Sequence, residues 1–189
     1  MLGPYHIFTY LSFLVLGSFL ITYFFKLYNN LLLIERNINK SWASIDALLF
    51  NKCDQISKLL NIVKPYMDKE KNIICEEFEL AKEMLEKNAI EYKAIANNKI
   101  SNTLKTVLAM PKEYVELQSN QRFINLKNRI KDLEFNISDR IEFYNDSANY
   151  FNIKIQSFPG IIIAFFTNFN QQSIFFIPNI KKCNEQILK

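Results

Sequence analysis

Residues that could do chemistry are few and scattered along this chain. The densest group of possible metal ligands is an acidic cluster formed by Glu76, Glu77 and Glu79. A carboxylate metal site in a helical bundle pairs glutamates with histidines three residues away on facing helices. The single histidine, His6, lies far from the cluster. We therefore interpret the cluster as a solvated helix face and expect no metal or other cofactor.

Nucleophilic catalysis is equally poorly supported. A serine or cysteine nucleophile needs a base beside it, and His6 lies next to an apolar run that would keep it in or across a membrane. The three cysteines, Cys53, Cys75 and Cys183, are odd in number and far apart, which argues against structural zinc and against a disulfide framework. We expect no catalytic residues and a protein that is not an enzyme. An enzyme with an unrecognised lysine or glutamate site is the weakest alternative.

The charge pattern does not indicate a nucleic-acid partner. The net charge is only +4, and acidic and basic residues alternate, whereas nucleic-acid binders gather basic residues into a patch or stripe. The nearest candidates, Lys69 with Lys71 and Lys181 with Lys182, are interpreted as solvated surface.

The clearest organising element is an uncharged run over residues 7–25. At about 1.5 Å per residue, such a run can cross the ~30 Å hydrocarbon core of a bilayer. It is long for a signal peptide and has no small-residue cleavage site before Lys26, so we predict an uncleaved transmembrane helix after a short segment 1–6. Lys26, Arg36 and Lys40 follow the run, which predicts a cytoplasmic C-terminal domain and an outside N-terminus.

Residues 26–159 are predicted to form a helical domain. Glycine (3) and proline (5) are scarce, and apolar residues recur every three or four positions, as in packed helices and coiled coils. Helices are expected over about 31–63, 69–97, 101–110 and 123–155, with Pro65 ending the first and Asp68 capping the second. Lys52 is the one break in the first apolar seam. Short links favour an elongated antiparallel bundle of three to four helices.

The hydrophobic C-terminal tail, residues 160–189, begins after Pro159. Its apolar segments 161–166 and 174–177 are too short and interrupted to span a bilayer. We expect the tail to fold over the bundle, with insertion into the membrane interface as the alternative.

Two segments of the chain together resemble the LemA family. The first contains Tyr-Asn just after the apolar run and continues toward position 66; the second contains Phe-Tyr-Asn-Asp at 143–146 and ends in Phe-Pro. The resemblance covers about residues 1–177, although this chain has Pro65 where the family has glycine. The motif residues that we quote are Tyr28, Asn29, Arg36, Asn37, Trp42, Asp46, Asp54, Tyr144, Asn145, Asn152, Phe158 and Pro159.

The resemblance implies a single-pass protein of the bacterial inner membrane, an all-α bundle, and no established catalytic activity. We interpret the motif residues as buried hydrogen-bonding groups between helices, in preference to a ligand site. The expected function is a non-enzymatic scaffold or interaction module at the membrane surface, with the lipid bilayer and an unknown protein as partners, and an oligomer possible. The alternative is a membrane-organising or lipid-binding protein that uses the apolar tail.

Overall fold

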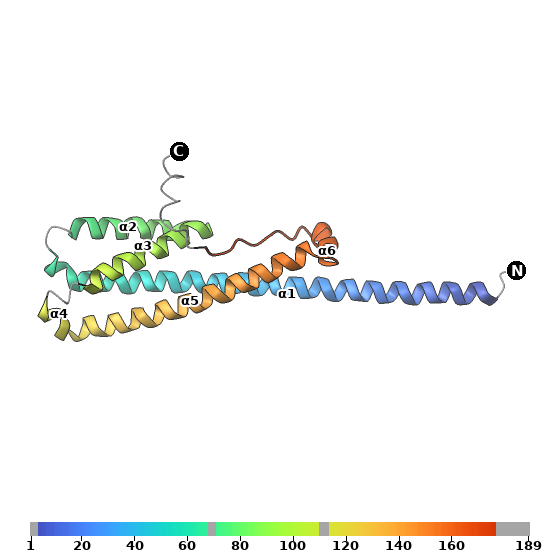
Figure 1. The fold of residues 1–189 in the computed structure, drawn as a ribbon, viewed down its shortest axis with the longest axis horizontal. Coiled ribbons are helices and arrows are strands. Elements are labelled where there is room, and N and C mark those ends of the chain that lie inside the picture. Colours follow the sequence, from blue (N-terminus) through green and yellow to red (C-terminus); the bar gives the residue numbers. More distant parts are fainter. Residues whose placement is uncertain (1–3, 68–70, 110–113, 177–189) are drawn as a thin grey trace, which may run out of the picture. The chain divides into compact units, whose positions relative to one another are not determined.

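Helices are the only regular secondary structure wherever the chain's structure is described. The computed structural model describes residues 4–67, 71–109 and 114–176, and within these ranges every regular element is a helix. This confirms the predicted all-α fold with a long apolar N-terminal helix and bundle-like packing. The elements are α1 (Pro4–Val63), the 3₁₀ turn η1 (Lys64–Tyr66), α2 (Lys71–Glu86), α3 (Ile90–Ala109), α4 (Val115–Ser119), α5 (Gln121–Gln156) and α6 (Gly160–Thr167) (Figure 1).

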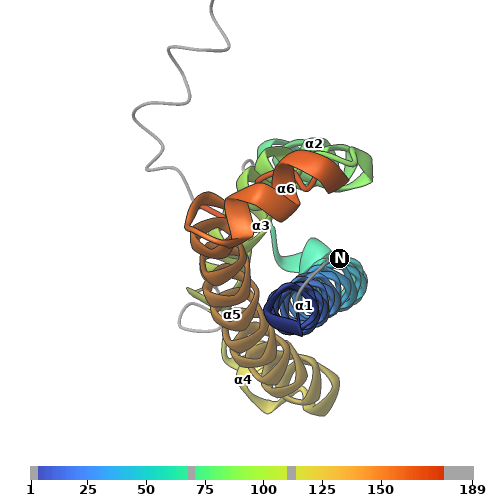
Figure 2. The ribbon, with the colours of Figure 1, turned by 90° about the vertical axis from the view of Figure 1, so that its right-hand side faces the viewer.

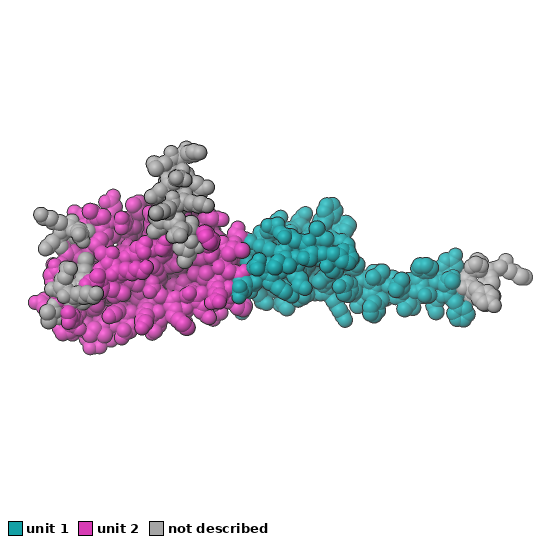
Figure 3. Space-filling view, in the orientation of Figure 1, with its two compact units in different colours: residues 1–40, 146–172 teal, residues 41–145, 173–189 magenta. Residues whose placement is uncertain are grey.

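The helices contribute to two compact units, which Figure 3 colours separately. The first unit comprises residues 1–40 and 146–172, and the second comprises residues 41–145 and 173–189. Both α1 and α5 are long enough to belong to both units.

The second unit is the bundle. In it α2 and α3 form a helical hairpin packed side by side (Figure 1). The register of α1 against α5 follows from two contacts: Trp42 meets Tyr144, and Lys52 meets Glu134. Ten positions forward on α1 (52 − 42) correspond to ten positions backward on α5 (144 − 134), so these two helices are antiparallel, as predicted.

The core of the bundle follows the three-four apolar spacing of the sequence. Ile45, Leu49 and Ile56 of α1 are buried, as are Ile130 and Ile137 of α5. Together these residues form one apolar stripe on each helix. An amphipathic helix gains most of its stability by burying such a stripe.

The boundary between the second and third helices differs from the prediction. We predicted separate helices over about 69–97 and 101–110, whereas the chain turns at residues 87–89 and Ser101 lies inside α3. Tyr92 is exposed, while Lys93 and Asn97 are buried. The turn contains neither glycine nor proline, so the usual signals of a helix boundary are missing there.

Other helix ends follow local chemistry. Val63 ends α1 two residues before Pro65, as predicted. The Oδ1 atom of Asn120 accepts hydrogen bonds from the backbone N–H groups of Arg122 (3.0 Å) and Phe123 (3.2 Å), which caps α5. The predicted cap Asp68 lies outside the described residues.

The first unit contains the N-terminal part of α1, the end of α5, and α6. Residues 8–16 and 18–20 of α1 are exposed and no other element of this unit covers them (Figure 3). After α5, the chain reverses through residues 157–159 into α6, which folds back at the end of α5 (Figure 2). This reversal needs glycine, because a Cβ atom at Gly160 would lie 2.0 Å from the carbonyl oxygen of Lys154.

Candidate functional site

A buried lysine organises the polar centre of the bundle. Lys52, only 2% exposed, reaches from α1 to two other helices. Its Nζ atom donates hydrogen bonds to Asn97 Oδ1 (2.9 Å) and Ser101 Oγ (2.6 Å) of α3 and lies 3.1 Å from Glu134 Oε1 of α5. Ser101 Oγ in turn donates to Glu134 Oε1 at 3.1 Å. This lysine cluster therefore joins three helices through one ammonium group.

Burial changes the proton affinity of this lysine. Loss of water around Lys52 lowers its pKa from the ordinary value of 10.5, while the Glu134 charge and hydrogen bond act in the opposite direction. A buried charge is costly unless it is paired and hydrogen-bonded. The four-residue cluster supplies both kinds of partner.

A second buried lysine, Lys93, is only 3% exposed. Lys93 of α3 pairs with the carboxylate of Asp46. Its ammonium group also lies 5.2 Å from the ring centre of Phe50 and 6.0 Å from that of Trp42. Aromatic faces attract cations at such distances, so this pair is held by both a carboxylate and aromatic rings.

Both lysines pair with side chains of the bundle itself. Buried ion pairs of this kind can specify how neighbouring helices align, so we interpret these pairs as structural and not as groups that act on a substrate. The buried Cys53 beside Lys52 is a poor nucleophile, because burial raises the pKa of its thiol and keeps it protonated. Within residues 4–67, 71–109 and 114–176, no group of three potential metal ligands gathers. Glu76, Glu77 and Glu79 are exposed on α2, which agrees with a solvated face.

Two asparagines of α5 form hydrogen bonds with the backbone of the returning C-terminal segment. In the first unit, Asn152 Nδ2 donates to the Gln172 carbonyl (2.9 Å), and the Gln172 N–H donates to Asn152 Oδ1 (2.8 Å). In the second unit, Asn145 forms the same pair of bonds with the Phe175 carbonyl (3.1 Å) and N–H (2.8 Å). We call each of these two-bond contacts an asparagine clamp. A clamp satisfies both backbone groups of one residue in an extended segment.

Tyr144 reinforces the clamp of the second unit. Its hydroxyl donates to the Ser173 carbonyl at 2.7 Å, and its ring lies 5.6 Å from that of Trp42. Burial raises the pKa of Tyr144, which keeps the hydroxyl protonated and able to donate. Phe175 completes this aromatic group, with its ring 6.0 Å from Trp42. The segment 173–175 therefore packs on the bundle. For these residues of the tail, the structure agrees with the expectation that the tail folds over the bundle.

The remaining motif residues do not form one site. Tyr28 stacks on Phe169 with ring centres 6.1 Å apart, and Asp54 pairs with its neighbour Lys58 at the surface. The peptide bond between Phe158 and Pro159 is cis and leads into α6. Five motif residues are exposed, so burial does not account for them: Asn29, Arg36, Asn37, Asp54 and Phe158.

Sequence reasoning missed the partners of the buried lysines. In the sequence, Lys52 is only a break in an apolar seam, and Glu134 does not stand out as its partner. One signal was available: a lysine at a seam position is costly, and so it predicts a carboxylate on a facing helix. Which carboxylate pairs with it depends on helix register, which the spacing within one helix does not determine.

Comparison with known families supports the motif-based resemblance. The model of the LemA family matches residues 41–187. The chain belongs to the LemA family. The match begins after Asn37, so Tyr28, Asn29, Arg36 and Asn37 lie outside the part of this LemA protein that defines its membership.

Two curated relatives are similar over a shorter stretch. This LemA protein is 29% identical over 80 residues to the magnetosome proteins MamQ 1 and MamQ 2 of Paramagnetospirillum magneticum. The stretch covers 42% of this chain and 29% of each relative. The chain thus spans less than a third of the length of these relatives.

We expect Asn145→Ala to loosen the C-terminal segment. The substitution leaves the backbone N–H and carbonyl of Phe175 without their partners, a loss of roughly 1–2 kcal/mol. Amide hydrogen exchange at Phe175 should then be about tenfold faster. Asn136→Ala is the matched control, since Asn136 is exposed on the same helix. Equal exchange at Phe175 in the two variants would show that the clamp does not hold the segment.

Proposed function

We propose that this LemA protein is a non-enzymatic, single-pass membrane protein that holds a helical interaction surface beside the bilayer. The proposal rests on the length and apolar character of α1. Among the described residues, α1 is the one helix long and apolar enough to span a membrane. None of the most apolar stretch of this helix is buried. Exposed side chains such as Phe8, Phe13 and Phe19 need an apolar surrounding that water does not supply.

One helix, α1, contributes residues to both the proposed anchor and the bundle. The same helix contains the exposed run and, farther along, the buried seam of the second unit. Lys26, Arg36 and Lys40 follow the uncharged run, and this positive flank favours the cytoplasmic side. We propose an inner-membrane location in a bacterial cell with the bundle in the cytoplasm.

Membrane fractionation tests the anchor. Each arginine at the centre of a span costs roughly 2.5–3.5 kcal/mol, so Leu16→Arg/Leu20→Arg should add roughly 5–7 kcal/mol and release the protein from membranes washed with alkaline carbonate. The matched control is Leu33→Arg/Leu80→Arg, which changes two comparably exposed leucines outside the run. The control should stay in the membrane pellet; release of both variants, or of neither, contradicts a span at 7–25.

Labelling tests the orientation. Cys75 is half-buried on α2, so a membrane-impermeant maleimide should reach it only after cells are permeabilised. Labelling of Cys75 in intact cells would contradict a cytoplasmic bundle.

The surface of the bundle favours a protein partner. Phe135 and Phe143 of α5 are exposed in the second unit, and aromatic residues on a surface are enriched at protein interfaces. Photo-crosslinking residues at these two positions should capture the same protein in cells, whereas one at exposed Lys105 of α3 should not. Different products from positions 135 and 143, or none, would contradict an interface on this helix.

A second candidate function, lipid engagement, rests on α6. This helix carries no charge and leaves Phe165 (80%) and Phe166 (79%) largely exposed. We propose that α6 inserts into the membrane interface. In a Trp42→Phe background, brominated phospholipids should quench Phe165→Trp fluorescence and leave Tyr92→Trp, on the bundle surface, unquenched. An unquenched Phe165→Trp would exclude the insertion.

A further inference from the structure

We infer that α1 and α6 of the first unit form a binding groove for the acyl chain of a bilayer phospholipid. This inference rests on the proposed membrane location and names a ligand for it. The groove measures about 440 Å³, within the roughly 300–1,000 Å³ of small-molecule sites. Its walls are four residues of α1, between positions 21 and 28, and four residues of α6, between positions 162 and 167.

The chemistry of the walls selects an apolar ligand. Among the eight lining residues only Tyr28 and Thr167 carry a side-chain polar atom, and neither is charged. The Thr167 hydroxyl already donates to the Ile163 carbonyl at 2.8 Å. A polar ligand would therefore lose its water and meet, at most, the Tyr28 hydroxyl as a side-chain partner, whereas a hydrocarbon chain gains by leaving water.

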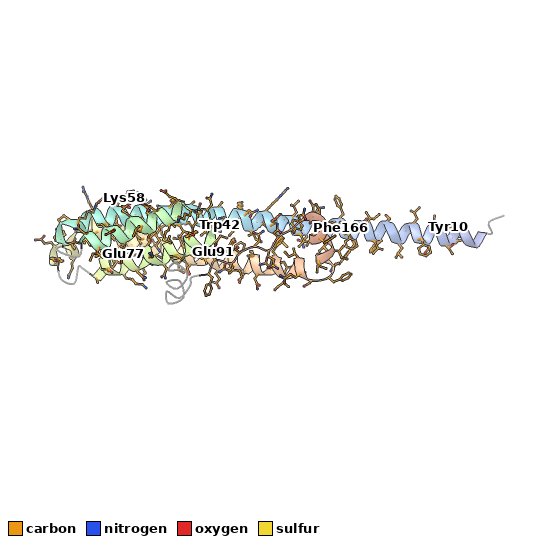
Figure 4. The ribbon with its side chains drawn as sticks, turned by 90° about the horizontal axis from the view of Figure 1, so that it is seen from above. Tyr10, Trp42, Lys58, Glu77, Glu91 and Phe166 are labelled. Carbon is orange, nitrogen blue, oxygen red and sulfur yellow. The ribbon has the colours of Figure 1, made fainter. Side chains whose placement is uncertain are left out.

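The position of the groove along α1 indicates that its hydrocarbon ligand comes from a bilayer phospholipid. Ile21, Phe24 and Phe25 are the last apolar residues of the uncharged run, and Lys26 is the first charge after it. The groove therefore lies at the depth where acyl chains meet headgroups. Figure 4 labels Tyr10 on α1, much nearer the N-terminus of that helix than the level of Phe166.

The construction of α6 keeps the groove in place and open to lipid. Ile163 is buried and fixes one face of α6, while Phe166 stands exposed at the groove. Tyr28 also stacks on Phe169, which follows α6. A wall that is fixed on one side and exposed on the other can admit a flexible chain from the surrounding bilayer.

Photo-crosslinking with a defined lipid tests this inference. The full-length protein is reconstituted into phosphatidylethanolamine–phosphatidylglycerol vesicles that contain a phosphatidylcholine with a diazirine midway along one acyl chain. After illumination, mass spectrometry should place adducts on Tyr28 and on residues 162–167, in addition to those along 8–20 that any span would give.

A matched pair of variants tests occupancy. Ile162→Trp fills the groove and should lower the adduct yield on Tyr28 roughly tenfold. Ile161→Trp places the same side chain outside the groove lining and should leave the yield unchanged. Adducts confined to residues 8–20, an equal yield in both variants, or crosslinks from these positions to a second copy of the chain would overturn the inference.

The same vesicles separate failure of the inference from failure of the proposed function. If the protein floats with the vesicles and Phe165→Trp is quenched, but no adduct forms at the groove, the acyl-chain site is wrong and the membrane proposal stands. If the protein does not float, both are wrong.

Discussion

Phe151→Ala should lower the free energy of unfolding by roughly 3–5 kcal/mol, the usual cost of removing a fully buried phenylalanine. Phe151 is 0% exposed, and its ring lies 5.7 Å from that of Phe169 in an edge-to-face arrangement. Phe169 also stacks on Tyr28 of α1. Removal of Phe151 therefore opens a cavity among the rings that hold the returning chain in the first unit. Urea denaturation of the full-length protein in detergent measures the loss.

Tyr150→Ala is the control for this prediction. Tyr150 precedes Phe151 on α5 but is about half exposed, and its ring makes one surface contact, with the ammonium group of Lys154 at 5.3 Å. Its loss should cost less than about 1 kcal/mol. Similar losses for the two variants would mean that the aromatic group does not stabilise this unit.

Glu134→Ala should destabilise the bundle by about 3 kcal/mol at pH 7. Breaking a buried ion pair costs roughly 3–5 kcal/mol because one charge is left uncompensated; the lower end applies since the Glu134 side chain is 39% exposed. In a Lys52→Met background the same substitution should cost far less, because no ammonium remains to be paired. A double-mutant cycle measures this coupling.

The pH dependence of that loss has a defined sign. Burial lowers the pKa of Lys52 in the folded protein below its unfolded value of 10.5, so the unfolded state binds more protons as pH approaches 10.5. Stability then rises with pH in that window. The rise should be steeper in Glu134→Ala, which has lost the charge that favours protonation of Lys52. The difference in stability between this variant and the native protein should therefore narrow as the pH rises.

Glu142→Ala provides the control on the same helix. Glu142 is exposed on α5, so its loss should change stability by no more than about 0.5 kcal/mol. If Glu134→Ala and Glu142→Ala behave alike at pH 7, the lysine cluster contributes nothing through its charge pair.

The helices of this protein were largely predictable, because periodicity is a property of each segment alone. The seam from Leu31 to Val63 and that from Phe123 to Ile155 both face the core at most of their positions. Pro65 ended a helix as its chemistry requires. The hairpin turn at 87–89 was missed, since its residues carry no strong turn signal and the packing of α2 on α3 determines the boundary.

The functional features were predictable only in part. The polar motif residues Tyr144, Asn145 and Asn152 could be singled out, but they were expected to bond between bundle helices. Instead they hold the backbone of residues 172–175. A backbone partner has no side-chain signature, so no pattern of residue types could reveal it.

By itself, the sequence determined an uncharged run, its positive flank, and helices with one apolar face each, since these depend on neighbours along the chain. Three features depend on the tertiary structure: Lys52 pairs with Glu134, asparagines form hydrogen bonds with the returning segment, and α6 lies along the end of the uncharged run. Those pairings join residues far apart in sequence. Their energies depend on register and burial, which exist only once the helices have packed.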